Sequence, residues 1–452
     1  MVDVKSLLKY SWFNGLLVGL ACSAFGLALW MTPWLQDWEA VPWQWRVRAL
    51  AKPGPATDQI KVILIDQASL DWAASENGLS WPWPREAYVP ILDFCRRAGV
   101  KAVAFDMIYS EPSAFMASDD VVFGESIGAR RDFIASFFIG DQAAQTSTWP
   151  ADLPAAPLTV DGFDAWIAHP ARAALIEPRA TFPIPAVAQN AALLANVKEG
   201  PDRDAMHRRV SPLRAFAGQP VPLLALGACL VGQGEPPYTL SINETGLRVG
   251  SLHVPLDESG RAILRYRGPS GTHESLSAAA VIQSELRIIE GGTPVIPPED
   301  LKDCYVFFGV SAPGLKDLKP TPVSADYPGV EIHATFLDNL LSQDFLRDAP
   351  RTPVAVTTVL LSVLAGILIV RSRSVQGSVL WAAVLLAIPV ATGFALYVLG
   401  WWWPVMVQSV SVGLAIGVGE IVNYATEGRQ KRFIKSAFKQ YLSGEVIEQI
   451  LV

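Results

Sequence analysis

Uncharged apolar runs long enough to cross a membrane lie near both ends of the chain. The first is residues 12–31, and no comparable run follows until residues 353–370, 379–399 and 404–422. A helix needs about 20 apolar residues to cross roughly 30 Å of hydrocarbon. The pattern therefore predicts four transmembrane helices, one before and three after a long intervening region.

Basic residues beside these runs predict the orientation. Lys5 and Lys9 lie in residues 1–11, before the first span, and five Lys or Arg side chains follow the last span in residues 423–452. Positive charge close to a span favours the cytoplasmic side. We therefore expect a multi-pass membrane protein with both termini in the cytoplasm and residues 32–350 periplasmic or extracellular.

Two of the spans carry small residues four positions apart. Gly15 and Gly19 lie in the first span, and Ser409, Gly413 and Gly417 lie in the fourth. Small residues at this spacing let helix backbones approach closely. They predict either packing within one four-helix bundle or dimerisation, and the spacing alone leaves both open.

Between the first and second spans, strand patterns alternate with helical patterns. Strands are expected at residues 60–65, 101–105, 133–139, 262–266 and 305–310, and helices at residues 85–97, 221–231 and 330–341. Residues 140–182, rich in Ala and Pro, are expected to form an elaborated loop or a small subdomain. Strands separated by helices imply a parallel or mixed sheet with helices on both faces. The predicted fold is an α/β extracytoplasmic domain plus a four-helix transmembrane region.

Composition supports membrane insertion and excludes several functions. Hydrophobic residues make up 51% of the 452 residues and charged residues only 17%, which is too apolar for a soluble protein of this size. The net charge of -7 offers no basic patch for nucleic acid. Four cysteines without metal-ligand spacing are expected to be small buried side chains rather than a zinc site or a disulfide framework. No catalytic, metal or cofactor motif is visible.

Polar residues directly follow three of the predicted strands. They are Asp66, Asp106 and the turn that runs from Ser311 to Asp317. Ligands of open α/β sheets favour the crevice outside the carboxyl ends of the strands. We therefore predict that these residues converge on one rim and bind a small ligand or a cation.

An aromatic loop follows the first strand of this region. Trp81 and Trp83 are predicted to form an aromatic wall, with Arg85 as a cationic anchor for the ligand. The competing interpretation is that the acidic residues cap helices and turns while the Trp side chains pack the domain edge. The pair Arg208 and Arg209 is interpreted as a solvated turn rather than an anion site.

Four sequence motifs carry a family resemblance. They are VILIDQASLDW, WPWPREAYVPILDFCRRAGVKAVAFDMIYSEPS, DRDAMHRRVSPLRAF and GVSAPGLKDLKPTPVSADYPGVEIHATFLDNLLSQDFL. In this order they resemble the CHASE type 2 family of extracellular sensory domains, whose members typically have one span before the domain and three after it. The resemblance implies a sensor for an unknown extracytoplasmic ligand or protein. One departure is Ala205, where the family tends to have Gly after an Asp-x-Asp pair.

The last residues suggest what the sensor controls. RFIKSAFKQYLSGEVIEQIL resembles the linker before class III nucleotide cyclase domains, and its apolar and capping positions would transmit the signal. These positions are Phe438, Tyr441, Leu442, Ser443 and Val446. The resemblance implies a membrane-bound adenylate cyclase, a homodimer whose catalytic domain lies beyond Val452. ATP and Mg²⁺ or Mn²⁺ are expected for that domain alone.

Alternatives to this function remain open at the level of the sequence. Sensors of this type also precede kinases and other output domains. The chain also fits a non-enzymatic membrane protein whose outer domain binds a protein partner. The C-terminal helix, in turn, has the amphipathic pattern of a helix that lies on the lipid surface.

Overall fold

The computed structural model describes residues 11–129, 131–140, 145–153, 156–315, 317–372 and 374–438, with side chains described as far as residue 426. Its internal contacts divide the chain into two compact units. The membrane unit comprises Met1–Arg46 and Asp348–Val452, and the sensor unit comprises Val47–Arg347. The sequence analysis placed residues 32–46 in the outer region, whereas the structure groups them with the membrane helices.

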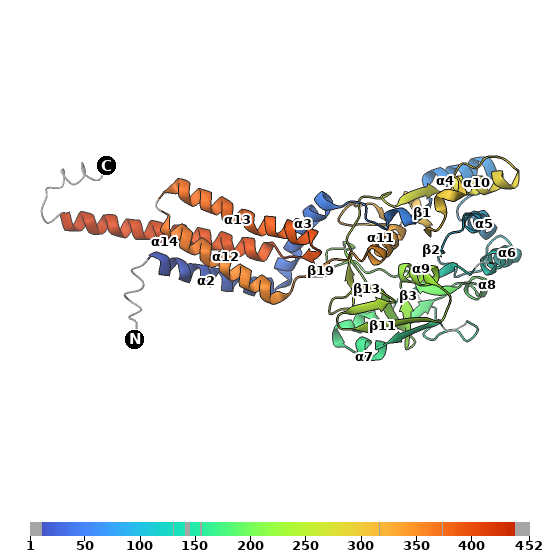
Figure 1. Ribbon diagram of the computed structural model, residues 1–452, viewed down its shortest axis with the longest axis horizontal. Coiled ribbons are helices and arrows are strands. Elements are labelled where there is room, and N and C mark those ends of the chain that lie inside the picture. The colour runs from blue at the N-terminus through green and yellow to red at the C-terminus, as the bar shows by residue number, and fades with distance from the viewer. Residues whose placement is uncertain are drawn as a thin grey trace. The chain divides into compact units, whose positions relative to one another are not determined.

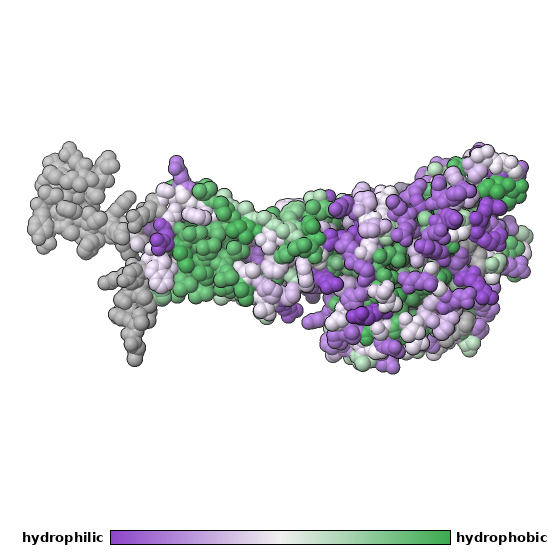
Figure 2. All heavy atoms as spheres, viewed as in Figure 1, coloured by the Kyte–Doolittle hydropathy of each residue, from purple (hydrophilic) through white to green (hydrophobic). Residues whose placement is uncertain are grey.

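Four long apolar helices make up most of the membrane unit (Figure 1). They are α2 (Ser11–Trp30), α12 (Arg351–Arg371), α13 (Val375–Val398) and α14 (Met406–Phe438). Each is long and apolar enough to cross a membrane, α14 through its segment Met406–Thr426. Figure 2 shows hydrophobic side chains gathered over these helices. The predicted four-helix membrane region is confirmed by these helices, while Lys5 and Lys9 lie outside the described residues.

A further helix, α3 (Pro33–Leu50), was not predicted by the hydropathy pattern. It contains Pro42 and several charged residues, so it lacks the composition of a membrane span. Trp34, Trp38 and Trp45 are exposed on it, as is typical of rings at a membrane interface. Two short strands, β19 (Arg347–Asp348) and β20 (Trp401–Trp402), pair with each other in a two-stranded sheet.

The two stripes of small residues have different surroundings. A Cβ added to Gly15 would lie 2.6 Å from the Gly366 carbonyl oxygen of α12, and one added to Gly19 would collide with the backbone at Val363. These glycines therefore pack α2 directly against α12. A Cβ added to Gly413 or Gly417 meets no atom of the described residues within 4 Å. Those two positions of the α14 stripe are consequently open in the single chain.

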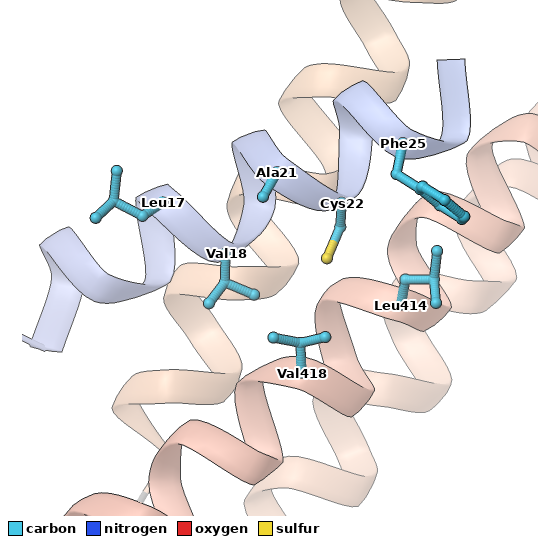
Figure 3. A pocket seen from close by; sticks show the side chains of 7 residues that line it. All are labelled: Leu17, Val18, Ala21, Cys22, Phe25, Leu414 and Val418. Atoms are coloured by element: carbon cyan, nitrogen blue, oxygen red, sulfur yellow. The ribbon is translucent and has the colours of Figure 1, made fainter. Parts of the chain in front are cut away.

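An apolar groove of 420 Å³ lies between α2 and α14 (Figure 3). Its lining residues are Leu17, Val18, Ala21, Cys22, Phe25, Leu414 and Val418. Because the lining is almost entirely hydrocarbon, the groove suits an apolar occupant and offers nothing to a polar ligand.

A mixed sheet forms the centre of the sensor unit. Its strands are β15 (Glu274–Ser277), β1 (Ile60–Ile65), β16 (Tyr305–Val310), β2 (Ala102–Phe105), β3 (Phe133–Gly140), β7 (Leu193–Asn196) and β6 (Arg179–Thr181). The order is β15-β1-β16-β2-β3, and β3 then pairs with both β7 and β6. Every pair is parallel except that of β3 with β6. The carboxyl ends of β1, β16, β2, β3 and β7 therefore meet at one edge.

Helices cover both faces of this sheet, as predicted. One set comprises α4 (Gln67–Asn77), α5 (Val89–Ala98), α6 (Ala117–Gly128) and α10 (Ala278–Ile289), and the other comprises α9 (Leu224–Gln233) and α11 (Gly329–Ser342). Ile63 and Ile65 of β1 lie in the core with α5 and α10. The intervening residues of β1 point to the opposite face because side chains alternate along a strand.

Residues 140–182 contribute strands to three different sheets of the sensor unit, because β4 (Leu158–Asp161), β5 (Ile176–Glu177) and β6 pair with β11 (Tyr238–Asn243), β9 (Leu213–Phe216) and β3. They also contain α7 (Phe163–Ile167). β4 joins a second sheet of order β13-β12-β11-β4 with β11 (Tyr238–Asn243), β12 (Gly246–Val249) and β13 (Leu252–Pro255). Since β4 pairs in parallel with a strand about 80 positions later in the chain, local sequence patterns gave no sign of this sheet.

Smaller elements complete the sensor unit. They are α8 (Pro185–Ala188), β8 (Arg209–Val210), β9 (Leu213–Phe216), β10 (Gln219–Pro222), β14 (Ala262–Ile263), β17 (Leu318–Lys319) and β18 (Tyr327–Pro328). The strand predicted at residues 262–266 shortens to β14, which pairs with β8 outside the central sheet. All four cysteines belong to the described residues, where each is buried and none forms a disulfide.

The interpretation of Arg208 and Arg209 as a solvated turn is wrong. Arg208 is 2% exposed, and its guanidinium donates to both carboxylate oxygens of Asp204, at 2.7 and 2.6 Å. Arg209 donates to Asp257 at 2.7 Å. Ala205, the residue that departs from the family pattern, has a φ of 64°. The turn thus forms in a left-handed conformation that favours glycine.

Candidate functional site

Three carboxylic acids gather at the carboxyl edge of the central sheet. Asp106 directly follows β2, Glu199 follows β7, and Asp317 lies in the loop after β16. The Asp106 amide donates to the Phe308 carbonyl of β16 at 2.8 Å, which fixes the start of its loop against the neighbouring strand. We call Asp106, Glu199, Asp317 and the adjacent His333 the acidic edge.

His333, on α11, is the buried centre of the acidic edge. It is 1% exposed. Its Nε2 lies 4.0 Å from Asp106 Oδ2, and its Nδ1 lies 3.5 Å from Glu199 Oε1. Neither His333 Nδ1 nor Glu199 Oε1 has a hydrogen-bond partner in the described part of the chain. Unsatisfied buried polar atoms are costly, so a proton shared by His333 Nδ1 and Glu199 Oε1 would stabilise this arrangement.

Asp317 is held at the start of α11. Its carbonyl accepts the Gly329 amide at 3.0 Å, and its carboxylate lies 3.1 Å from Lys319 Nζ. A Cβ at Gly329 would lie 2.9 Å from both carboxylate oxygens. Glycine at this position therefore leaves room for the acid beside the positive end of the helix.

The shared environment changes the pKa values of these groups. Burial, and then the charge of Asp317, raise the pKa of Asp106 to about 8, against the lowering effect of Lys319. Burial raises the pKa of Glu199 well above its usual range, and the charges of Asp106 and Asp317 raise it further. Burial also lowers the pKa of His333 to about 3. Near neutral pH, Asp106, Glu199 and His333 are therefore mostly uncharged, and binding a cation would favour ionised carboxylates.

Asp66 and Ser311 have local structural contacts. The Asp66 carboxylate caps α4, accepting from the Ser69 amide at 2.8 Å, the Ser69 hydroxyl at 2.6 Å and the Ser277 hydroxyl at 3.0 Å. The Ser311 amide donates to the Ile65 carbonyl at 3.1 Å. Of the four residues predicted on this rim, the structure brings Asp106 and Asp317 into electrostatic contact, while Asp66 follows the capping interpretation.

The predicted aromatic wall and cationic anchor are engaged elsewhere. The Arg85 guanidinium pairs with Asp120 and donates to the Glu111 carbonyl, so its charge is already neutralised. Trp83 is 4% exposed and belongs to the hydrophobic core, whereas Trp81 is 37% exposed. These contacts match the packing interpretation, and we do not include the three residues in the acidic edge.

Glu199 and His333 were missed by the sequence analysis. Glu199 follows β7, a strand that was not predicted, and His333 is one of five scattered histidines. Parallel pairing of β7 with β3 brings Glu199 to the shared edge. The described residues contain no group of three His, Cys, Asp or Glu side chains arranged to hold a metal ion.

The signal-transmitting positions expected at the C-terminus lie at the limit of the structure. Phe438 is the last residue of α14, and its side chain is not described. Tyr441, Leu442, Ser443 and Val446 lie outside the described residues.

Comparison with known families identifies the sensor. Residues 18–369 match the model of the CHASE2 domain, a range that runs from α2 into α12. The chain belongs to the CHASE2 family. No curated protein and no solved structure gave a match. A CHASE2 sensor domain together with four apolar helices supports a sensory receptor role in a membrane.

Proposed function

We propose that this CHASE2 protein is the receptor part of a class III adenylate cyclase in a bacterial inner membrane. The observation that carries the proposal is the continuity of α14, a 33-residue helix that begins as an apolar span and ends at Phe438. The last residues of this helix and those after it, RFIKSAFKQYLSGEVIEQIL, resemble the linker before class III cyclase domains. One helix thus leads from the membrane into the segment that would control the output.

The acidic edge is the proposed place of signal recognition. Asp106 and Glu199 lie within 4.0 Å of the buried imidazole of His333, and the charge of Asp317 acts on both acids. His333 Nδ1 and Glu199 Oε1 have no hydrogen-bond partner among the described residues. This electrostatic environment favours a small cationic ligand, which would ionise Asp106 and Glu199 on binding. A difference of about 1 to 3 kcal/mol in ligand affinity between two arrangements of the receptor suffices for a several-fold to hundred-fold response.

The membrane unit is proposed to work as a homodimer in contact with lipid. Gly413 and Gly417 leave an open face on α14, which suits close approach of a second α14. The groove between α2 and α14 suits lipid acyl chains. The sensor unit lies in the periplasm or outside the cell in this proposal, with both termini in the cytoplasm. ATP and Mg²⁺ or Mn²⁺ serve only the catalytic domain.

A chimaera tests the proposed coupling. A class III catalytic domain is fused after Val452, and residues are inserted after Thr426 in α14. Seven extra residues return the helix to nearly the same phase, whereas two rotate it by roughly 200°. We expect the seven-residue insertion to preserve cyclic AMP synthesis in membranes and the two-residue insertion to change it several-fold. Equal activity in both insertions and the parent would contradict the proposal.

A further inference from the structure

A buried ion pair on α3 contacts the start of α14. Glu39 and Arg46 are 7% and 1% exposed, and Arg46 Nη2 donates to Glu39 Oε1 at 2.9 Å. Both residues belong to the membrane unit. Buried charges require partners for every polar atom, and the remaining partners of this pair lie on other elements.

The second oxygen of Glu39 caps α14. Glu39 Oε2 accepts the Val405 amide at 2.8 Å and the Met406 amide at 2.7 Å. The first amides of a helix have no partner within the helix, and a carboxylate at that end also interacts favourably with the helix dipole. A side chain from α3 therefore supplies the N-terminal cap of the fourth spanning helix.

Arg46 and Trp43 hold the turn that precedes α14. Arg46 Nη1 donates to the Trp403 carbonyl at 2.7 Å, and Trp43 stacks on Trp402 with ring centroids 4.6 Å apart. Gly393 of α13 makes room for this arrangement, because a Cβ there would lie 3.1 Å from Arg46 Nη1. Backbone, charge and aromatic contacts thus fix α3 to one end of α14.

We infer that Glu39 and Arg46 form a joint through which movement of α3 displaces α14, an inference that builds on the proposed receptor function. Covalent continuity supplies the input, since α3 runs on to Leu50 and the sensor unit begins at Val47. The output side is α14, which runs without a break to Phe438. A cap made by an adjacent helix, rather than by the local chain, ties the position of α14 to that of α3.

The test uses Glu39→Gln, which keeps the shape of the side chain but removes its charge. Asp37→Asn is the matched control, because Asp37 is exposed on the same helix. Amide hydrogen exchange in residues 401–408 of the full chain in lipid nanodiscs should become about ten-fold faster in Glu39→Gln, because the variant loses the charged carboxylate that caps α14. The control should exchange at the parent rate.

Spin labels then report whether α14 moves. Val375 and Tyr424 are 81% and 84% exposed, so cysteines there accept labels once the four native cysteines are replaced. The inter-label distance should shift by on the order of 2 Å in Glu39→Gln and stay unchanged in Asp37→Asn. An unchanged distance despite faster exchange, or an unchanged exchange rate, overturns the inference.

A second variant guards against misfolding of the first. Arg46→Lys keeps the positive charge but cannot reach Glu39, Pro42 and Trp403 together as the guanidinium does. It should shift the label distance in the same direction, and a distance equal to that of the parent overturns the inference. Neither readout involves a cyclase, so an insensitive cyclase chimaera would refute the proposed output and leave this joint intact.

Discussion

The acidic edge makes a direct prediction about the protonation of Asp106. Its pKa is raised from 3.8 to about 8, first by burial and then by the charge of Asp317. Each pKa unit corresponds to about 1.4 kcal/mol, so ionising Asp106 in the folded chain costs about 6 kcal/mol more than in a model peptide. At pH 7 roughly nine in ten molecules should therefore carry a proton on this side chain.

The sign of the effect on stability follows from proton linkage. Between about pH 4 and pH 8 the folded chain keeps a proton on Asp106 that the unfolded chain has lost. The contribution of Asp106 to the free energy of unfolding therefore falls by about 1.4 kcal/mol per pH unit as pH rises through this range. The pKa of His333 is lowered from 6.5 to about 3, so its contribution to the free energy of unfolding rises with pH between these two values. Between pH 6.5 and pH 8, the contribution of Asp106 to stability therefore changes with pH while that of His333 does not.

Infrared difference spectroscopy on the full chain in lipid nanodiscs measures this titration. As the pH is raised, the infrared band of protonated carboxyl groups in the parent should lose a component with a midpoint near pH 8. This component should be absent from Asp106→Asn at every pH. Asp317→Asn should lower the pKa of Asp106, and Lys319→Gln should raise it, because their charges act in opposite directions. A component that titrates near pH 4, or a midpoint that both variants leave unchanged, would refute the reasoning.

Three further predictions concern the fold and the membrane unit. Ala205→Gly should raise the free energy of unfolding by about 1 kcal/mol in chemical denaturation, because Ala205 has a φ of 64°; a loss of stability would contradict this. Asp338→Asn should lower the free energy of unfolding by about 3 kcal/mol, because Arg267 and His273 both lose a buried charged partner. If the variant unfolded at the same temperature as the parent, Asp338 would not have this stabilising role. Gly19→Leu should prevent helix packing and reduce the yield of monodisperse protein in size-exclusion chromatography, whereas Gly413→Leu should leave the folded monomer intact; equal yields would show that the two glycine positions are equivalent.

Local patterns were sufficient for much of the fold. Buried strands such as residues 60–65 and 305–310 are continuous apolar runs, and β1 and β16 have these bounds. The membrane spans are equally visible in the sequence, because an uncharged run of about 20 apolar residues has the length and composition of a transmembrane helix. The helix α3 was missed because its Trp residues alternate with Pro42 and charges, and only contacts with the turn before α14 show how Glu39 and Arg46 are buried.

The acidic edge could be predicted only in part, for a physical reason. Asp106 and Asp317 follow apolar runs that the sequence identifies as strands, so their shared edge was predictable. Glu199 reaches that edge through β7, a short strand whose pairing with β3 is non-local. His333 lies on an almost entirely buried helix, where no periodicity distinguishes a functional histidine from a packed one.

Accessibility of the two units from opposite sides of the membrane is the most direct test of a transmembrane receptor. Single cysteines at exposed positions of the sensor unit, such as Glu258, and at Val452 are treated in intact cells with a reagent that cannot cross the inner membrane. The account predicts rapid labelling of the sensor position and labelling of Val452 only after lysis. Labelling of both positions in intact cells, or of neither before lysis, would contradict it.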